Sequence, residues 1–198
     1  WWRRVGGVIF HSSRERDAFY RYYALPTGQP GFEIVPHERY FERRCALDRA
    51  AARRMLGVEP GVCQLLCIGF IQPHKGFDRV IRALAAVPQA DNLRLKIVGS
   101  VRLAWDKAHA YARELHELAG RDARCEVIET WLSDELFDAW LIAADYVVLP
   151  YREIWTSGVA ARARLYGRPL LAADTGSLSE QLTPGSMSMY WSASFTSR

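Results

Sequence analysis

VCQLLCIGFIQPHKGFDRVIRAL, residues 62–84, joins an apolar run with a single polar residue, Gln64, to a loop and an amphipathic segment. The run 62–70 does not alternate with polar residues, which is typical of a strand buried on both faces of a parallel sheet. Gly69 then allows the chain to turn, and a helix begins at Phe77 or Asp78. Its apolar face contains Phe77, Val80, Ile81 and Leu84. The stretch therefore predicts a strand, a loop and a helix of an α/β fold.

The same pattern continues along the chain. Further short apolar runs lie at 93–98, 125–128, 146–149 and 170–173, with amphipathic segments between them. Strands that alternate with helices form a parallel sheet covered on both faces. Residues 62–198 are therefore predicted to form a Rossmann-like α/β domain. Aromatic side chains on its helices are expected to pack in the core; they include Trp105, Tyr111 and Trp140.

The first 61 residues have a different organisation. Two apolar runs, 5–11 and 33–36, flank a helical segment at 14–24, which predicts a strand, a helix and a strand. We expect residues 1–40 to be a fragment of a second α/β domain, and 41–61 to be a charged linker with a short helix. Because the chain lacks an initiator Met and opens within a structured segment, we expect it to be a fragment.

Composition excludes several classes of protein. With 49% hydrophobic and 24% charged residues the chain is globular, and it has no apolar run long enough to cross a membrane. The net charge of +4 comes without a block of more than two Lys or Arg residues, so nucleic acid binding is not expected. The four cysteines form no CxxC pair, and Cys63 and Cys67 are expected to be buried thiols. A cytoplasmic setting follows.

Ligands of parallel α/β sheets bind at the carboxyl ends of the strands, which selects particular loops. In the loop after residue 68, Lys75 stands beside Gly76 and a helix start, a combination that suits a phosphate. The loop lacks GxxxxGK[ST], and the chain lacks GxGxxG, so a P-loop and NAD or FAD are not expected. The alternative is a surface lysine in an ordinary loop.

A second loop, 150–158, precedes a helix that starts near Val159. Thr156, Ser157 and Gly158 are good helix-capping residues, and the helix start would present N–H groups to an anion. Glu153 accepts hydrogen bonds and suits ribose or sugar hydroxyls, although it is equally explained as a solvated acid.

A third pocket is required if a nucleotide binds here. A lysine and a helix start together contribute roughly 3 kcal/mol, which corresponds to millimolar affinity or weaker. Trp131 and Leu132 could supply a flat apolar surface, although Trp131 is equally explained as a core residue. The five histidines form no catalytic constellation, and no metal site is expected.

Four stretches of the chain, taken in order, resemble the carboxyl-terminal half of a GT-B glycosyltransferase of retaining family 4. They are LLCIGFIQPHKGFDRVIRAL, LRLKIVGS, VIETWLSDELFDAWLIAADYVVLPY and SGVAARARLYGRPLLAADTGSLSEQL. The resemblance covers residues 62–182. VIFHSS and FEIVPHERY resemble the end of that family's amino-terminal, acceptor-binding domain. The carboxyl-terminal domain of such enzymes binds a nucleotide-sugar donor.

The resemblance implies transfer of a sugar from a nucleotide diphosphate sugar to a hydroxyl of a glycan or lipid-linked acceptor, without a metal or other cofactor. Lys75 and Glu153 would be the catalytic residues, on the diphosphate and the sugar hydroxyls. The donor-binding residues would be Gly69, Gly76, Gly99, Trp131, Leu132, Ser157, Gly158, Val159 and Arg162. Backbone around Trp131 would hold the base, and N–H groups of 157–159 would hold the phosphates.

Two positions depart from the family's pattern. Phe70 replaces a basic residue that often follows the first glycine, and Arg162 lies near the place of a second glutamate. A non-catalytic GT-B-like binding or assembly protein and a sugar-nucleotide epimerase are therefore the alternatives.

The resemblance also implies a place for the protein in the cell. We expect a role in polysaccharide biosynthesis in the cytoplasm, with peripheral association of the full-length protein at the inner face of the membrane. The donor domain is expected to be incomplete at its carboxyl end, and the chain alone to be inactive.

Overall fold

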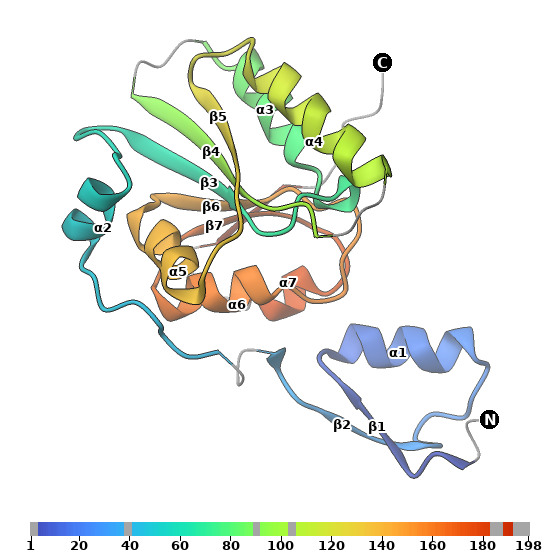
Figure 1. The fold of residues 1–198 in the computed structure, drawn as a ribbon. Helices are drawn as coiled ribbons and strands as arrows, with labels where there is room; N and C mark the ends of the chain where they lie inside the picture. Colours follow the sequence, from blue (N-terminus) through green and yellow to red (C-terminus); the bar gives the residue numbers. More distant parts are fainter. Residues whose placement is uncertain (1–3, 38–40, 89–91, 103–105, 183–187, 192–198) are drawn as a thin grey trace.

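A computed structural model describes residues 4–37, 41–88, 92–102, 106–182 and 188–191. It contains a large parallel α/β unit and a smaller β-α-β unit, joined by a linker with one short helix (Figure 1). No helix among these residues is long and apolar enough to span a membrane.

The large unit is built on a six-stranded parallel sheet of order β5-β4-β3-β6-β7-β8. Its strands are β3 (Cys63–Ile68), β4 (Leu93–Gly99), β5 (Cys125–Glu129), β6 (Tyr146–Leu149), β7 (Leu170–Ala173) and β8 (Ser188–Trp191). From β3 the chain first builds toward β5 and then returns to place β6 on the other side of β3. The strand order therefore reverses between β3 and β6, which is the point where parallel α/β sheets bind ligands.

Helices cover both faces of this sheet (Figure 1). The two helices α3 (Phe77–Ala86) and α4 (Asp106–Ala119) pack together on one face. On the other face lie α5 (Asp134–Ala143) and α6 (Gly158–Leu165), followed by the short α7 (Leu178–Gln181). Sequence analysis predicted this architecture, and the structure confirms it.

The core lies between the sheet and these helices. Its apolar side chains come from every predicted strand of the large unit and include Leu66, Ile68, Leu95, Ile97, Val147 and Leu149. Tyr111 and Trp140 pack in the core as predicted, whereas Trp105 lies outside the described residues. Cys67 is buried and Cys63 partly buried, and both are free thiols.

The smaller unit consists of β1 (Gly7–Phe10), α1 (Ser13–Tyr22) and β2 (Gly31–Ile34), and the two strands pair in parallel. Phe10 and Tyr20 are its buried aromatic residues, and their rings lie 6.2 Å apart. The unit confirms the predicted order of strand, helix and strand, although β2 begins two residues earlier than the apolar run.

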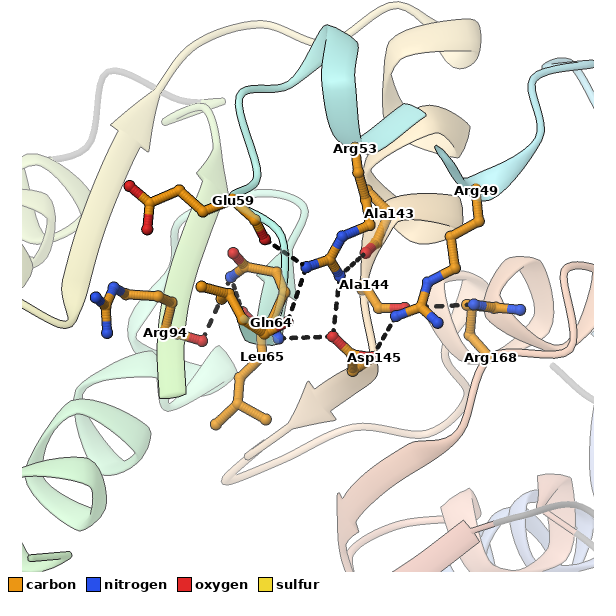
Figure 2. A network of polar contacts seen from close by, with 11 residues as sticks. Arg49, Arg53, Glu59, Gln64, Leu65, Arg94, Ala143, Ala144, Asp145 and Arg168 are labelled. Atoms are coloured by element: carbon orange, nitrogen blue, oxygen red, sulfur yellow. Dashed lines mark hydrogen bonds and ion pairs between the residues drawn. The ribbon is translucent and has the colours of Figure 1, made fainter. Parts of the chain in front are cut away.

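The linker helix α2 (Arg49–Met55) begins at Asp48, whose side chain accepts a hydrogen bond from the Ala51 N–H. Figure 2 shows how arginines of α2 hold it against the sheet. Arg53 donates to Asp145 Oδ2 over 3.1 Å, and Arg49 pairs with the same carboxylate. Burial favours the neutral acid, but hydrogen bonds from Gln64 and the two arginines outweigh it and lower the pKa of Asp145. The helix α2 is therefore fixed at the amino edge of the sheet, away from the ligand-binding edge.

Candidate functional site

Glycines bring the loops at the carboxyl edge into backbone contact. A Cβ atom on Gly99 would lie 1.8 Å from the Gly69 carbonyl oxygen, and one on Gly76 would lie 2.2 Å from the Pro150 oxygen. Gly76 also has a φ of +66°, which side chains rarely adopt. The loops after β3, β4 and β6 thus form one floor without intervening side chains. Three glycines that sequence analysis selected, Gly69, Gly76 and Gly99, lie in this floor.

Lys75 ends a short 3-10 turn, Pro73–Lys75, above this floor. Its Nζ atom lies 4.2 Å from the centroid of the buried Tyr151 ring, and burial lowers the pKa of the ammonium to about 8. Among the described residues Nζ has no hydrogen bond and no carboxylate partner. Lys75 is therefore not an ordinary solvated lysine but a desolvated cation that has no anionic partner in the described part of the chain.

An ion pair ties the loop of Lys75 to the loop of Glu153. Arg152 binds Asp78 in a bidentate manner over 2.9 and 2.7 Å, and Tyr111 donates to the same carboxylate over 2.7 Å. Burial pushes the pKa of Asp78 upward, but the hydrogen bonds from Arg152 and Tyr111 outweigh it and the pKa lies below its ordinary value. Sequence analysis missed this network, because residues 74 positions apart leave no local pattern.

Glu153 is exposed beside these groups, and no hydrogen bond to it is formed by the described residues. The structure thus leaves its carboxylate open to a ligand. His74 lies close enough for the two side chains to interact electrostatically.

The start of α6 differs in one respect from the prediction. Ser157 caps the helix, because its Oγ accepts from the Ala160 N–H over 3.2 Å. The Ser157 N–H itself donates to Gln181 Oε1 over 2.9 Å and is not free for a phosphate. The N–H groups of Gly158 and Val159 remain at the helix start as the predicted anion donors.

The linker reaches the same helix start. A Cβ atom on Gly158 would lie 3.0 Å from the Phe41 ring and 3.6 Å from His37 Nε2. Sequence analysis did not select these two residues, since the contact depends on how the small unit docks.

Trp131 and Leu132 follow β5, where Thr130 N–H donates to the Gly99 oxygen over 2.7 Å. The Trp131 side chain is 74% exposed, so the alternative that it is a core residue is wrong. Leu132 packs against the core and anchors the loop. Trp131 is therefore available to a ligand at the end of the neighbouring strand.

Arg162 points to the neighbouring helix. Its guanidinium binds Asp134 over 2.8 Å and the fully buried Asp138 over 2.5 Å, and it lies over the Phe137 ring. Two carboxylates already balance its charge, so it does not have the free cation that the predicted phosphate contact needs. Its observed role is to join α6 to α5.

The segment around α7 connects this edge to the small unit. Ser177 N–H donates to the Trp155 oxygen over 3.0 Å, and the hydroxyls of Ser177 and Ser12 lie 2.7 Å apart. Glu180 accepts hydrogen bonds from the N–H groups of Ser13 and Arg14 at the start of α1. These bonds outweigh the effect of burial and lower the pKa of Glu180. The α1 start is thus bound directly beside the candidate site.

The described residues contain no cluster of three or more His, Cys, Asp or Glu side chains that could hold a metal. The edge instead offers a desolvated cation, helix N–H groups, an open carboxylate and an exposed indole. This set suits a ligand with phosphates, hydroxyls and a flat ring.

Residues 63–193 match the family model described as glycosyl transferases group 1. The chain belongs to the group 1 glycosyltransferases. This glycosyltransferase chain is 33% identical over 182 residues to a D-inositol 3-phosphate glycosyltransferase of Streptomyces bingchenggensis. It is 30% identical over 169 residues to a GDP-mannose:glycolipid 4-beta-D-mannosyltransferase of Xanthomonas campestris pv. campestris. These matches cover 86% and 83% of the chain, but only 38% and 44% of the two relatives.

Among solved structures, the glycosyltransferase chain is similar to Anabaena HepE crystallised with UDP-glucose. The TM-score is 0.78 at 21% identity, and the match covers 96% of this chain and 51% of HepE. The similarity confirms the GT-B type of α/β fold. The retaining family 4 subtype and the domain boundaries remain predictions.

Proposed function

We propose that this chain carries the donor half of a glycosyltransferase, which moves a sugar from a nucleoside diphosphate sugar to an acceptor hydroxyl. The observation that carries the proposal is Lys75, a desolvated cation that no carboxylate of the described ranges neutralises, at the point where the strand order reverses. An ammonium kept from water and from carboxylates gains most from a ligand that brings its own negative charge.

The reaction assigns a role to each neighbouring group. As the bond between the sugar and the diphosphate breaks, its electron pair stays on the phosphate oxygen, where negative charge grows. The acceptor oxygen bonds to the sugar, and its hydroxyl proton passes to the released diphosphate. Lys75 and the N–H groups of Gly158 and Val159 would stabilise that charge. Glu153 would accept hydrogen bonds from ribose or sugar hydroxyls, and the base would lie beside Trp131.

The residues of the candidate site do not identify the base of the donor. HepE was crystallised with UDP-glucose, and the Xanthomonas relative is named for GDP-mannose. A nucleoside diphosphate is common to both, and it is the part of the donor that Lys75 would bind. The acceptor, a glycan or lipid-linked hydroxyl, and peripheral association with a membrane are proposals for the whole protein.

Calorimetric titration with UDP, GDP and ADP tests the proposal. We expect at least one of them to bind below millimolar, and Lys75→Ala to weaken that binding by at least tenfold. Arg121→Ala is the control, because Arg121 is exposed just after α4, at the opposite edge of the sheet. If no nucleotide binds below millimolar, the proposed function is wrong, and if Lys75→Ala binds like the parent chain, the site is wrong.

Two alternative functions differ from a glycosyltransferase in how they would process the donor. A non-catalytic binding protein is favoured by Phe70 and by the occupied Arg162, and it would bind the donor without releasing nucleotide even in the full-length protein. An epimerase would process the donor without an acceptor. Nucleotide release by the full-length protein that depends on an acceptor separates the transferase from both.

A further inference from the structure

Phe70 and Arg102 form an unusual pair at the carboxyl edge of the sheet. Phe70 follows Gly69 at the end of β3, and its side chain is 40% exposed. Arg102 follows the end of β4, and its guanidinium carbon lies 4.9 Å from the centroid of the Phe70 ring. A guanidinium held by its flat face keeps the N–H groups along its edge available for other partners.

Most cations that lie over aromatic rings in this protein are also neutralised or hydrogen-bonded. Arg16 pairs with Asp17, Arg43 donates to a carbonyl, and Arg162 pairs with two carboxylates. Lys75 and Arg102 differ, since within the described ranges neither has a hydrogen bond or a carboxylate partner. These two cations also follow neighbouring strands at the same edge of the sheet. Aromatic faces thus orient two positive charges there without cancelling them.

Backbone contacts hold the loop of Arg102 against the loop that leads to Lys75. Ile71 N–H donates to the Ser100 oxygen over 3.0 Å, which fixes the two loops on either side of the pair. A Cβ atom on Gly69 would lie 3.6 Å from a methyl group of Val159, in the first turn of α6. Gly69, the neighbour of Phe70 in the chain, therefore lies between the end of β4 and the first turn of α6.

We propose that Arg102 binds the donor diphosphate as the second cation beside Lys75, with Phe70 as the platform that orients it. The inference rests on the proposed function of this edge and adds a binding residue to it. A diphosphate carries at least two negative charges, and a planar guanidinium can bind two of its oxygens at once. Phe70 thereby has a role in phosphate binding even though its own side chain carries no charge.

The test uses whichever of UDP, GDP and ADP binds the parent chain most tightly, together with its nucleoside. We expect Arg102→Ala to raise the Kd of the diphosphate about tenfold and to leave nucleoside binding, followed by saturation-transfer NMR, unchanged. Phe70→Ala should raise the same Kd by about threefold, because the charge remains but its orientation is lost. Arg121→Ala, an exposed arginine at the opposite edge, should have no effect.

A double variant moves the positive charge from the loop after β4 to the loop after β3. Phe70→Arg in the Arg102→Ala background should restore the Kd of the diphosphate to within about threefold of the parent value, because residue 70 then supplies the cation. Circular dichroism melting of each variant confirms that it is folded.

The proposal is overturned if Arg102→Ala binds the diphosphate like the parent chain, or if it weakens the nucleoside equally. If Arg102→Ala leaves the Kd of the diphosphate unchanged while Lys75→Ala raises it, only the role of Arg102 is overturned. Absence of nucleotide binding by the parent chain would overturn the proposed function itself.

Discussion

Replacing Lys75 by methionine should make the protein more stable while weakening its affinity for nucleotide at least tenfold. Burial lowers the pKa of Lys75 from 10.5 to about 8, so the folded protein holds the charged form at a cost. At roughly 1.4 kcal/mol for each tenfold change in the protonation equilibrium, that cost is about 3 kcal/mol. Methionine keeps an unbranched apolar stem and needs no proton. For a chain of this size, about 3 kcal/mol raises Tm by roughly 6 to 12 °C.

The gain in stability from Lys75→Met depends on pH. Below pH 8 the lysine is charged in both the folded and the unfolded chain, and the cost is fully present. Between pH 8 and 10.5 the folded chain loses the proton first, so the cost declines. Above pH 10.5 both states are neutral and the advantage of methionine disappears. Nucleotide affinity of the parent chain should fall up to tenfold per pH unit above about pH 8, since binding then requires uptake of a proton.

Thermal melting at pH 7 and at pH 10.5, with calorimetry between pH 7 and 9, measures both effects. Lys107→Met is the control, because an exposed lysine gives no such gain. The reasoning is refuted if Lys75→Met melts at or below the parent temperature at pH 7 and still binds nucleotide as tightly.

Three further substitutions probe the supporting structure. Gly99→Ala places a Cβ atom 1.8 Å from the Gly69 oxygen. We expect the free energy of unfolding, measured with urea, to fall by about 3 kcal/mol and nucleotide binding to weaken. An unchanged free energy of unfolding would contradict the backbone contact. Arg162→Ala leaves the buried Asp138 without its cation, and it should cost about 3 kcal/mol while nucleotide affinity stays within twofold; a selective loss of affinity would instead restore its predicted phosphate role. Glu180→Ala removes the acceptor at the start of α1, so amide exchange at that helix start should quicken and stability fall by about 1 kcal/mol, and unchanged exchange would refute the contact.

The parallel sheet was predictable because each buried strand carries its own signal. The runs around Leu66 and Val147 are apolar except for Gln64, and such runs need helices on both faces. β8 was not predicted, since Ser188–Trp191 has neither charge nor a long apolar run, and its pairing with β7 supplies the order.

The site was predictable where chemistry and loop position coincide. Lys75 and the start of α6 follow from the rule that ligands meet the carboxyl ends of strands. Partners distant in sequence were not predictable: Arg152 with Asp78, and Arg162 with Asp138, are ion pairs between separate elements. For the same reason, the hydrogen bond from the Ser157 N–H to the Gln181 side chain could not be predicted.

The contacts between the loops at the carboxyl edge are made by main chain. Where Gly69 meets Gly99 and Gly76 meets Pro150, the spacing of the loops depends on peptide groups, and a larger residue would collide with the neighbouring backbone. Exposed positions such as Trp131 are under no such restriction, because an exposed side chain can change without moving the backbone. Substitutions at exposed positions could therefore alter the proposed base preference while the backbone that positions Lys75 stays the same.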